Sequence, residues 1–143
     1  MGTMRRIYWD TMLYVYWFEN HPKYAARIEQ IYAAMRLRGD LLCCSPLVYA
    51  EVLVGPVSTG DLDAVEALKS FFNSAEISML PFTTGAAPTF AALRASGIKA
   101  PDAMNLATAT SSGVDLFVTN DKRLHKITHP GMPFIATLET DLF

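Results

Sequence analysis

The amino-acid sequence predicts a three-layer α/β/α domain, in which a central, mainly parallel sheet of four or five short strands lies between helices. Short apolar segments alternate with helix-like segments along the whole chain, an order typical of parallel sheets. The apolar segments lack strict alternation of polar and apolar residues, which indicates strands covered on both faces. A length of 143 residues fits one domain, so residues 1–143 are treated as a single unit. Residues 1–3 are a candidate expression scar, with Met4 as the alternative start.

The first two predicted strands are each followed by helical segments. An apolar strand over residues 5–9 precedes Asp10 and Thr11, either of which is suited to cap a helix that extends to about residue 19. Apolar side chains at spacings of three and four residues predict a second helix from Tyr24, which ends at Gly39.

The second strand is expected over residues 41–44. Ser45 and Pro46 then suit the N-cap and first position of a helix over residues 47–54, and Gly55-Pro56 is the expected stop.

The second half of the chain continues the alternation of helices and strands. Helices are expected over residues 61–72, 84–96 and 101–112, because apolar faces or alanine-rich runs there are bounded by Gly97, Pro101 and Gly113. Strands are expected over residues 77–80, 116–119 and 134–136, with a short helical turn over residues 120–125.

Composition excludes several classes of protein. Hydrophobic residues make up 51% and charged residues 18%, which argues against disorder, and a net charge of −2 argues against a strongly cationic nucleic-acid wrapper. No apolar run approaches the roughly 20 residues that a membrane helix needs. Cys43 and Cys44 are neighbours and provide no disulfide framework, so we expect buried, inert thiols and a cytoplasmic protein.

Four carboxylates follow the predicted strands or lie in the helices after them. Asp10 follows the first strand, Glu51 lies inside the helix after the second, Asp102 begins a helix after Pro101, and Asp121 lies just past the fourth strand. Each has an ordinary structural explanation as a helix cap, a first-turn acid or a solvated side chain. In open parallel sheets, however, ligands gather at the carboxyl ends of the strands.

If these acids converge, their mutual repulsion calls for a cation. Mg²⁺ and Mn²⁺ prefer oxygen ligands, and a carboxylate-bound ion of this kind assists phosphodiester hydrolysis. Thr11 and Thr119 lie near the same strand ends, where their hydroxyls are suited either to orient a carboxylate or water or to cap locally. Asn105 lies on the same helix face as Asp102.

The sequence resembles the PIN-domain ribonucleases, and most closely the VapC-like toxins of toxin–antitoxin pairs. Four motifs between about residues 5 and 136 support the resemblance: Ile7–Thr11, Ser45–Leu53, Gly97–Ala109 and Leu116–Asp121. The resemblance implies a PIN-like fold, metal-binding acids at Asp10, Glu51, Asp102 and Asp121, and a site hydroxyl at Thr119. Met12 departs from the family, whose members often carry Asn or Ser there, and this puts one supporting hydrogen bond in doubt.

The same resemblance implies an Mg²⁺- or Mn²⁺-dependent endoribonuclease that acts as the toxin of a type II toxin–antitoxin system. The implied partners are an RNA substrate, a cognate antitoxin and a second copy of the chain. The aromatic residues Tyr14, Tyr16, Trp17 and Phe18 are candidates for a partner surface or for core packing. Lys122 and Arg123 are candidates for contacts with an RNA backbone or for a solvated helix face.

Two other functions fit the sequence. One is a non-catalytic α/β interaction module whose acids are only helix caps. The other is a haloacid-type aspartyl phosphatase with Asp10 as nucleophile, although such enzymes normally need a second Asp at the position of Met12. A zinc site is not expected, because His21, His125 and His129 lack suitable spacing and further ligands.

Overall fold

Five short strands form a single sheet in which every neighbouring pair runs parallel. The computed structural model describes residues 4–143, so the candidate expression scar at residues 1–3 lies outside the described residues. The order across the sheet is β3-β2-β1-β4-β5. The strands are β1 (Arg6–Trp9), β2 (Leu41–Cys44), β3 (Ile77–Met79), β4 (Leu116–Val118) and β5 (Phe134–Ala136).

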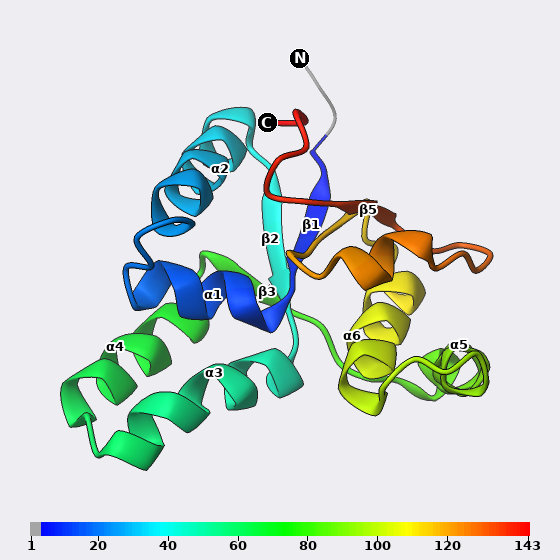
Figure 1. Ribbon diagram of the computed structural model, residues 1–143, viewed down its shortest axis with the longest axis horizontal. Coiled ribbons are helices and arrows are strands. Elements are labelled where there is room, and N and C mark those ends of the chain that lie inside the picture. The colour runs from blue at the N-terminus through cyan, green and yellow to red at the C-terminus, as the bar shows by residue number, and fades with distance from the viewer. Residues whose placement is uncertain (1–3) are drawn as a thin grey trace.

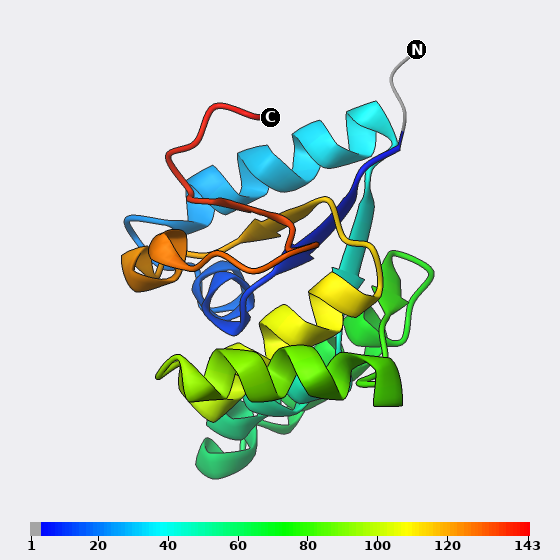
Figure 2. The ribbon, with the colours of Figure 1, turned by 90° about the vertical axis from the view of Figure 1, so that its right-hand side faces the viewer.

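Within residues 4–143, six α-helices flank this sheet, and the predicted three-layer α/β/α fold is confirmed (Figure 1). Turned by 90°, the molecule shows α2 on one side of the sheet and α5 and α6 on the other (Figure 2). The helices are α1 (Thr11–Phe18), α2 (Ala25–Arg38), α3 (Pro46–Thr59), α4 (Leu62–Phe72), α5 (Ala87–Ala95) and α6 (Ala100–Ser111), with 3₁₀ turns η1 (Thr84–Ala86) and η2 (Lys122–Lys126). No helix in this part of the chain is long and apolar enough to span a membrane.

The central strand β1 lies in the middle of the core. Its residues Ile7, Tyr8 and Trp9 have no exposed surface, because helices cover both faces of the sheet. The ring of Tyr8 stacks on that of Phe117 from β4, with centroids 5.3 Å apart. Both cysteines of β2 are buried and free, as predicted.

The aromatic residues of α1 divide between the core and the surface. Tyr14 is fully buried, and the ring of Trp17 packs edge-on against that of Trp9 at 5.6 Å. Phe18 is 41% exposed. Core packing therefore accounts for the inner part of this cluster.

The expected stop of the third helix at Gly55-Pro56 is wrong. Helix α3 continues through Pro56 to Thr59 and ends at Gly60, whose φ of 70° lies in the left-handed region. A proline disfavours helical backbone at the preceding residue partly through that residue's Cβ, and Gly55 has none. The helix expected from residue 84 also differs, because it starts as the 3₁₀ turn η1 before α5 begins.

The strand register brings the carboxyl ends of β1 and β4 together. Trp9 pairs with Val118, and the amide of Asp10 donates to the Val118 carbonyl at 2.9 Å. Asp10 and Thr119, the residues that leave these two strands, are therefore neighbours although 109 positions separate them.

Candidate active site

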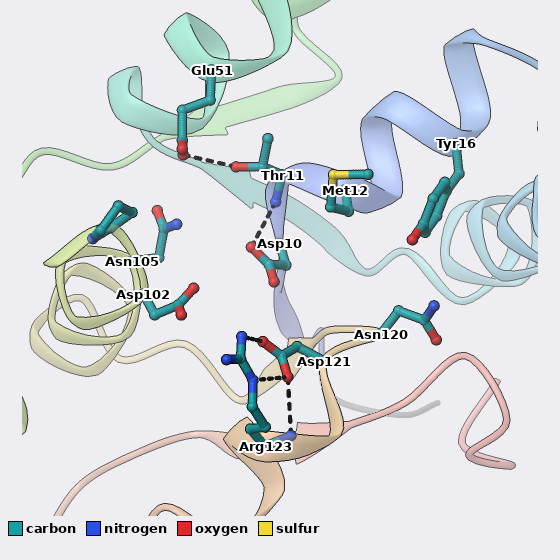
Figure 3. A pocket seen from close by; sticks show the side chains of 11 residues that line it. Asp10, Thr11, Met12, Tyr16, Glu51, Asp102, Asn105, Asn120, Asp121 and Arg123 are labelled. Carbon is teal, nitrogen blue, oxygen red and sulfur yellow. Dashed lines mark hydrogen bonds and ion pairs between the residues drawn. The ribbon is translucent and has the colours of Figure 1, made fainter. Parts of the chain in front are cut away.

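All four acidic residues singled out from the sequence line one pocket of about 300 Å³ at the carboxyl ends of the strands (Figure 3). They come from four separate segments of the chain. The lining is completed by polar, apolar and basic side chains: Thr11, Met12, Tyr16, Pro101, Asn105, Asn120 and Arg123.

Asp10 lies where β1 passes into α1, and it caps that helix. Its Oδ1 accepts a hydrogen bond from the Thr11 amide at 2.8 Å. Its Oδ2 accepts one from the Thr119 hydroxyl at 2.8 Å. The capping explanation is therefore correct for Asp10, but it does not exclude a second role, because the same carboxylate faces the pocket (Figure 3).

Thr119 connects two of the acids. Its side chain has no exposed surface, and its hydroxyl donates to Asp10 while it accepts from the Asp121 amide at 3.0 Å. Both roles considered for this hydroxyl are observed, because it orients the Asp10 carboxylate and also caps the local turn at Asp121.

Glu51 extends from α3 toward the start of α1. The Thr11 hydroxyl donates to its Oε1 at 3.0 Å, so both threonines hold acids of the pocket (Figure 3). Glu51 is only partly buried, at the edge of the apolar face formed by Val48 and Val52.

Asp102 lies in the first turn of α6, and Asn105 lies one turn further along the same helix. Both line the pocket, as their spacing predicts. Asn105 is only 2% exposed, whereas Asp102 is partly exposed.

Asp121 caps η2 and forms an ion pair with Arg123. Its Oδ1 accepts from the Arg123 amide and from Nε, both at 3.0 Å, and its Oδ2 accepts from Nη2 at 2.6 Å (Figure 3). Arg123 was considered for an RNA contact or a solvated face. Its side chain is 71% exposed, as expected for a solvated face, and its guanidinium also engages an acid of the pocket, because the tight η2 turn brings the two side chains together.

The pocket concentrates negative charge, and the ionisation of its acids reflects this. Burial raises the pKa of Asp10, and the charges of Asp102 and Glu51 raise it further, although the hydrogen bonds from Thr119 and the Thr11 amide act in the opposite direction. Burial and the charge of Asp121 also raise the pKa of Asp102. The pKa of Asp121 is lowered, because Arg123 donates to its carboxylate.

The donor set suits a hard divalent cation. Four carboxylates supply only oxygen atoms, which Mg²⁺ and Mn²⁺ prefer, and a cation would relieve the repulsion that adds to burial in raising the pKa of Asp10. Within residues 4–143, however, no three His, Cys, Asp or Glu side chains already stand close enough to hold one ion. The residues fit a metal chemically, and one of the four carboxylates, that of Asp121, is engaged in an ion pair with Arg123.

Several pocket residues were not predicted from the sequence. Tyr16 lies one turn after Met12 on α1. Because residues four apart share a helix face, this spacing could have placed Tyr16 beside Met12 at the pocket. Asn120 lies between Thr119 and Asp121, so its position at a strand end pointed to the pocket. Met12, 44% exposed, offers no polar group in place of the Asn or Ser expected by resemblance.

A family model described as the PIN domain matches residues 7–130, which is most of the chain. The chain belongs to the PIN-domain family. The matched range contains all four acids of the pocket and the two threonines, Thr11 and Thr119, that hydrogen-bond to them. No curated protein matches the chain in sequence.

Several solved structures have a similar fold. A chain of a toxin–antitoxin complex from Klebsiella pneumoniae is 21% identical, with 92% of this chain and 97% of that chain covered and a TM-score of 0.70. A chain of VapBC2 from Rickettsia felis, solved with a DNA fragment from its promoter, is 17% identical over 92% and 98% of the two chains, with a TM-score of 0.69.

A third similar structure is that of VapC20 from Mycobacterium tuberculosis, described as a toxin that cleaves the sarcin–ricin loop. It is 12% identical over 87% of this chain and 92% of that one, with a TM-score of 0.65. At these identities the likeness concerns the fold.

Proposed function

We propose that this PIN-domain protein is a divalent-metal-dependent endoribonuclease and the toxin of a type II toxin–antitoxin pair. The observation that carries the proposal is the convergence of Asp10, Glu51, Asp102 and Asp121 on one pocket at the carboxyl ends of the strands. Family membership, the two toxin–antitoxin complexes and the VapC20 toxin of similar fold support it.

The four carboxylates would hold one or two Mg²⁺ or Mn²⁺ ions. When bound, such an ion lowers the pKa of a water molecule and neutralises a phosphodiester oxygen. Asp10 is the best-fixed ligand, because the Thr11 amide and the Thr119 hydroxyl each hold one of its oxygens. Asp121 contributes its carboxylate only where a cation competes with Arg123 for it.

The partners follow from the same assignment. The substrate is RNA, a cognate antitoxin inhibits the protein, and the toxin acts as a homodimer in the cytoplasm. The antitoxin partner is supported by the complexes from Klebsiella pneumoniae and Rickettsia felis, which are toxin–antitoxin assemblies.

Cleavage of RNA by purified protein tests the proposal. With Mn²⁺ present, the native protein is expected to cleave cellular RNA, and sequencing of the new 5′ ends identifies the target. Asp10→Ala and Asp102→Ala are each expected to abolish cleavage and growth inhibition while the circular dichroism spectrum stays native.

Asp63→Ala is the matched control for Asp102→Ala. Asp63, like Asp102, lies in the first turn of a helix, but it lies in α4 and outside the pocket. Undiminished cleavage by the Asp102 variant would reject the assignment of that residue. If the native protein neither cleaves RNA nor shows a thermal shift with Mn²⁺, a non-catalytic interaction module is the better description.

A further inference from the structure

Three buried polar side chains form a chain of hydrogen bonds that ends at the pocket. Ser45 caps α3, Tyr8 lies in β1 and Asn105 lies in α6, and none of them is more than 3% exposed. The Tyr8 hydroxyl lies 2.7 Å from the Ser45 Oγ and 2.7 Å from the Asn105 Oδ1. Only Asn105 of the three lines the pocket.

The direction of this chain follows from counting protons. The single hydroxyl proton of Tyr8 serves only one of its two neighbours. If Tyr8 donates to Ser45, the buried Ser45 proton is left without an acceptor among residues 4–143, at a cost of about 1–3 kcal/mol. If Ser45 donates to Tyr8 and Tyr8 donates to Asn105, both hydroxyl protons of the chain have an acceptor.

The second arrangement fixes the orientation of the Asn105 amide. Its Oδ1 accepts from Tyr8, so its Nδ2 is turned away from Tyr8, and within the described residues no acceptor takes its protons. The chain is held at its Ser45 end, where the Val48 amide donates to Ser45 at 3.3 Å, and in its middle, where the Tyr8 ring stacks on Phe117. A nearly buried amide with free N–H groups is therefore presented to the pocket.

We infer that Asn105 donates a hydrogen bond to an anionic oxygen of the substrate phosphate, and that Tyr8 and Ser45 position it for this purpose. The inference rests on the proposed function. The pocket's four carboxylates repel a phosphate, and the guanidinium of Arg123 is engaged by Asp121. The Asn105 amide supplies a donor without adding charge to the metal-binding acids. In this orientation the amide presents its Nδ2–H groups, which are donors and do not coordinate a metal ion, to the pocket.

Steady-state cleavage of RNA tests the inference with a charge-matched control. Asn105→Asp removes the donor and is expected to raise KM about ten- to a hundredfold, the usual effect of losing a hydrogen bond to a charged group. Asn120→Asp adds the same charge to the same pocket, and the increase in KM that it causes is expected to be several-fold smaller than the increase caused by Asn105→Asp. Tyr8→Phe keeps the stacking ring but releases the amide, so it is expected to raise KM while kcat changes little.

A binding measurement separates this inference from the proposed function. The Asn105 side-chain amide signal in a ¹⁵N correlation spectrum, identified by its loss in Asn105→Asp, is followed during addition of thymidylyl-thymidine with Mg²⁺. A shift with this dinucleotide but not with thymidine, reduced in Tyr8→Phe, supports the inference even if the native protein cleaves no RNA.

Two results would overturn the inference. One is equal KM values for Asn105→Asp and Asn120→Asp in a protein that cleaves RNA, which would leave the proposed function intact. The other is an unmoved Asn105 amide signal, whether or not signals of Thr11 and Asn120 shift. An unmoved signal together with no cleavage by the native protein rejects both proposals.

Discussion

Replacing Thr119 with valine removes a hydroxyl that holds two acids of the pocket, while the side-chain volume is nearly unchanged. The lost bond to the Asp10 carboxylate, 2.8 Å long, is charge-assisted and contributes about 1.5–3 kcal/mol. The lost bond from the Asp121 amide, 3.0 Å long, contributes about 0.5–1.5 kcal/mol. Thr119→Val is therefore expected to lower the free energy of unfolding by about 2–4 kcal/mol.

For a domain of this size, such a loss lowers the melting temperature by roughly 10 °C. Thermal and urea unfolding of metal-free protein, followed by circular dichroism, measure it. Thr119→Ser is the control, because it keeps the hydroxyl and loses one buried methyl group at about 0.5–1.5 kcal/mol. If Thr119→Val is as stable as Thr119→Ser, the hydroxyl does not hold these residues as described.

The destabilisation by Thr119→Val should also depend on pH. Burial raises the pKa of Asp10 and the Thr119 hydroxyl opposes this rise, so the variant raises the pKa of Asp10 further. The native hydroxyl stabilises the ionised carboxylate, and its contribution is present above the folded-state pKa of Asp10 and fades as the pH falls through it. The stability difference between native protein and variant is expected to be larger at neutral pH than at about pH 4. A difference that does not change with pH would refute the assignment of this bond to the ionised form.

Three further predictions test other parts of the structure. Asp102→Asn is expected to stabilise the metal-free protein by about 0.5 kcal/mol at neutral pH, because the folded-state pKa of Asp102 is raised. The gain should vanish below about pH 4, and urea unfolding at the two pH values measures the gain and its loss. Arg123→Gln frees the Asp121 carboxylate and should tighten Mn²⁺ binding, measured by calorimetry, by roughly tenfold. Arg123→Lys keeps the charge without the bidentate contact and should give a smaller change. Unchanged Mn²⁺ affinity in Arg123→Gln would show that the ion pair does not compete with the metal ion. Burial raises the pKa of Cys44 to about 12 and also raises that of Cys43, so a thiol reagent should label neither cysteine until the protein is unfolded.

The fold could be predicted from local patterns, because short apolar strands and helix-ending glycines are properties of neighbouring residues. Helix boundaries were less predictable where two signals opposed each other. Gly55-Pro56 is a common stop, but Gly55 tolerates the position before proline, and α3 continues to Gly60.

The composition of the site could be predicted in part. Strand-end position pointed to Asp10, Thr119 and Asp121, since parallel strands bring their carboxyl ends together. The pairing of Asp121 with Arg123 could not be predicted from the sequence, because it depends on the tightness of the η2 turn rather than on residue type. The chain from Ser45 through Tyr8 to Asn105 was also hidden, because it joins segments up to 97 positions apart.

The place of β4 in the sheet determines when during synthesis the pocket becomes complete. β4, which pairs with β1, is synthesised before β5, and the Asp10 amide finds its carbonyl partner only when Val118 is in place. A growing polypeptide that has emerged as far as α5 carries Asp10 and Glu51 but neither Asp102 nor Asp121. A nascent chain that ends before α6 therefore lacks two of the four acids, and the pocket is complete only in the last stage of translation.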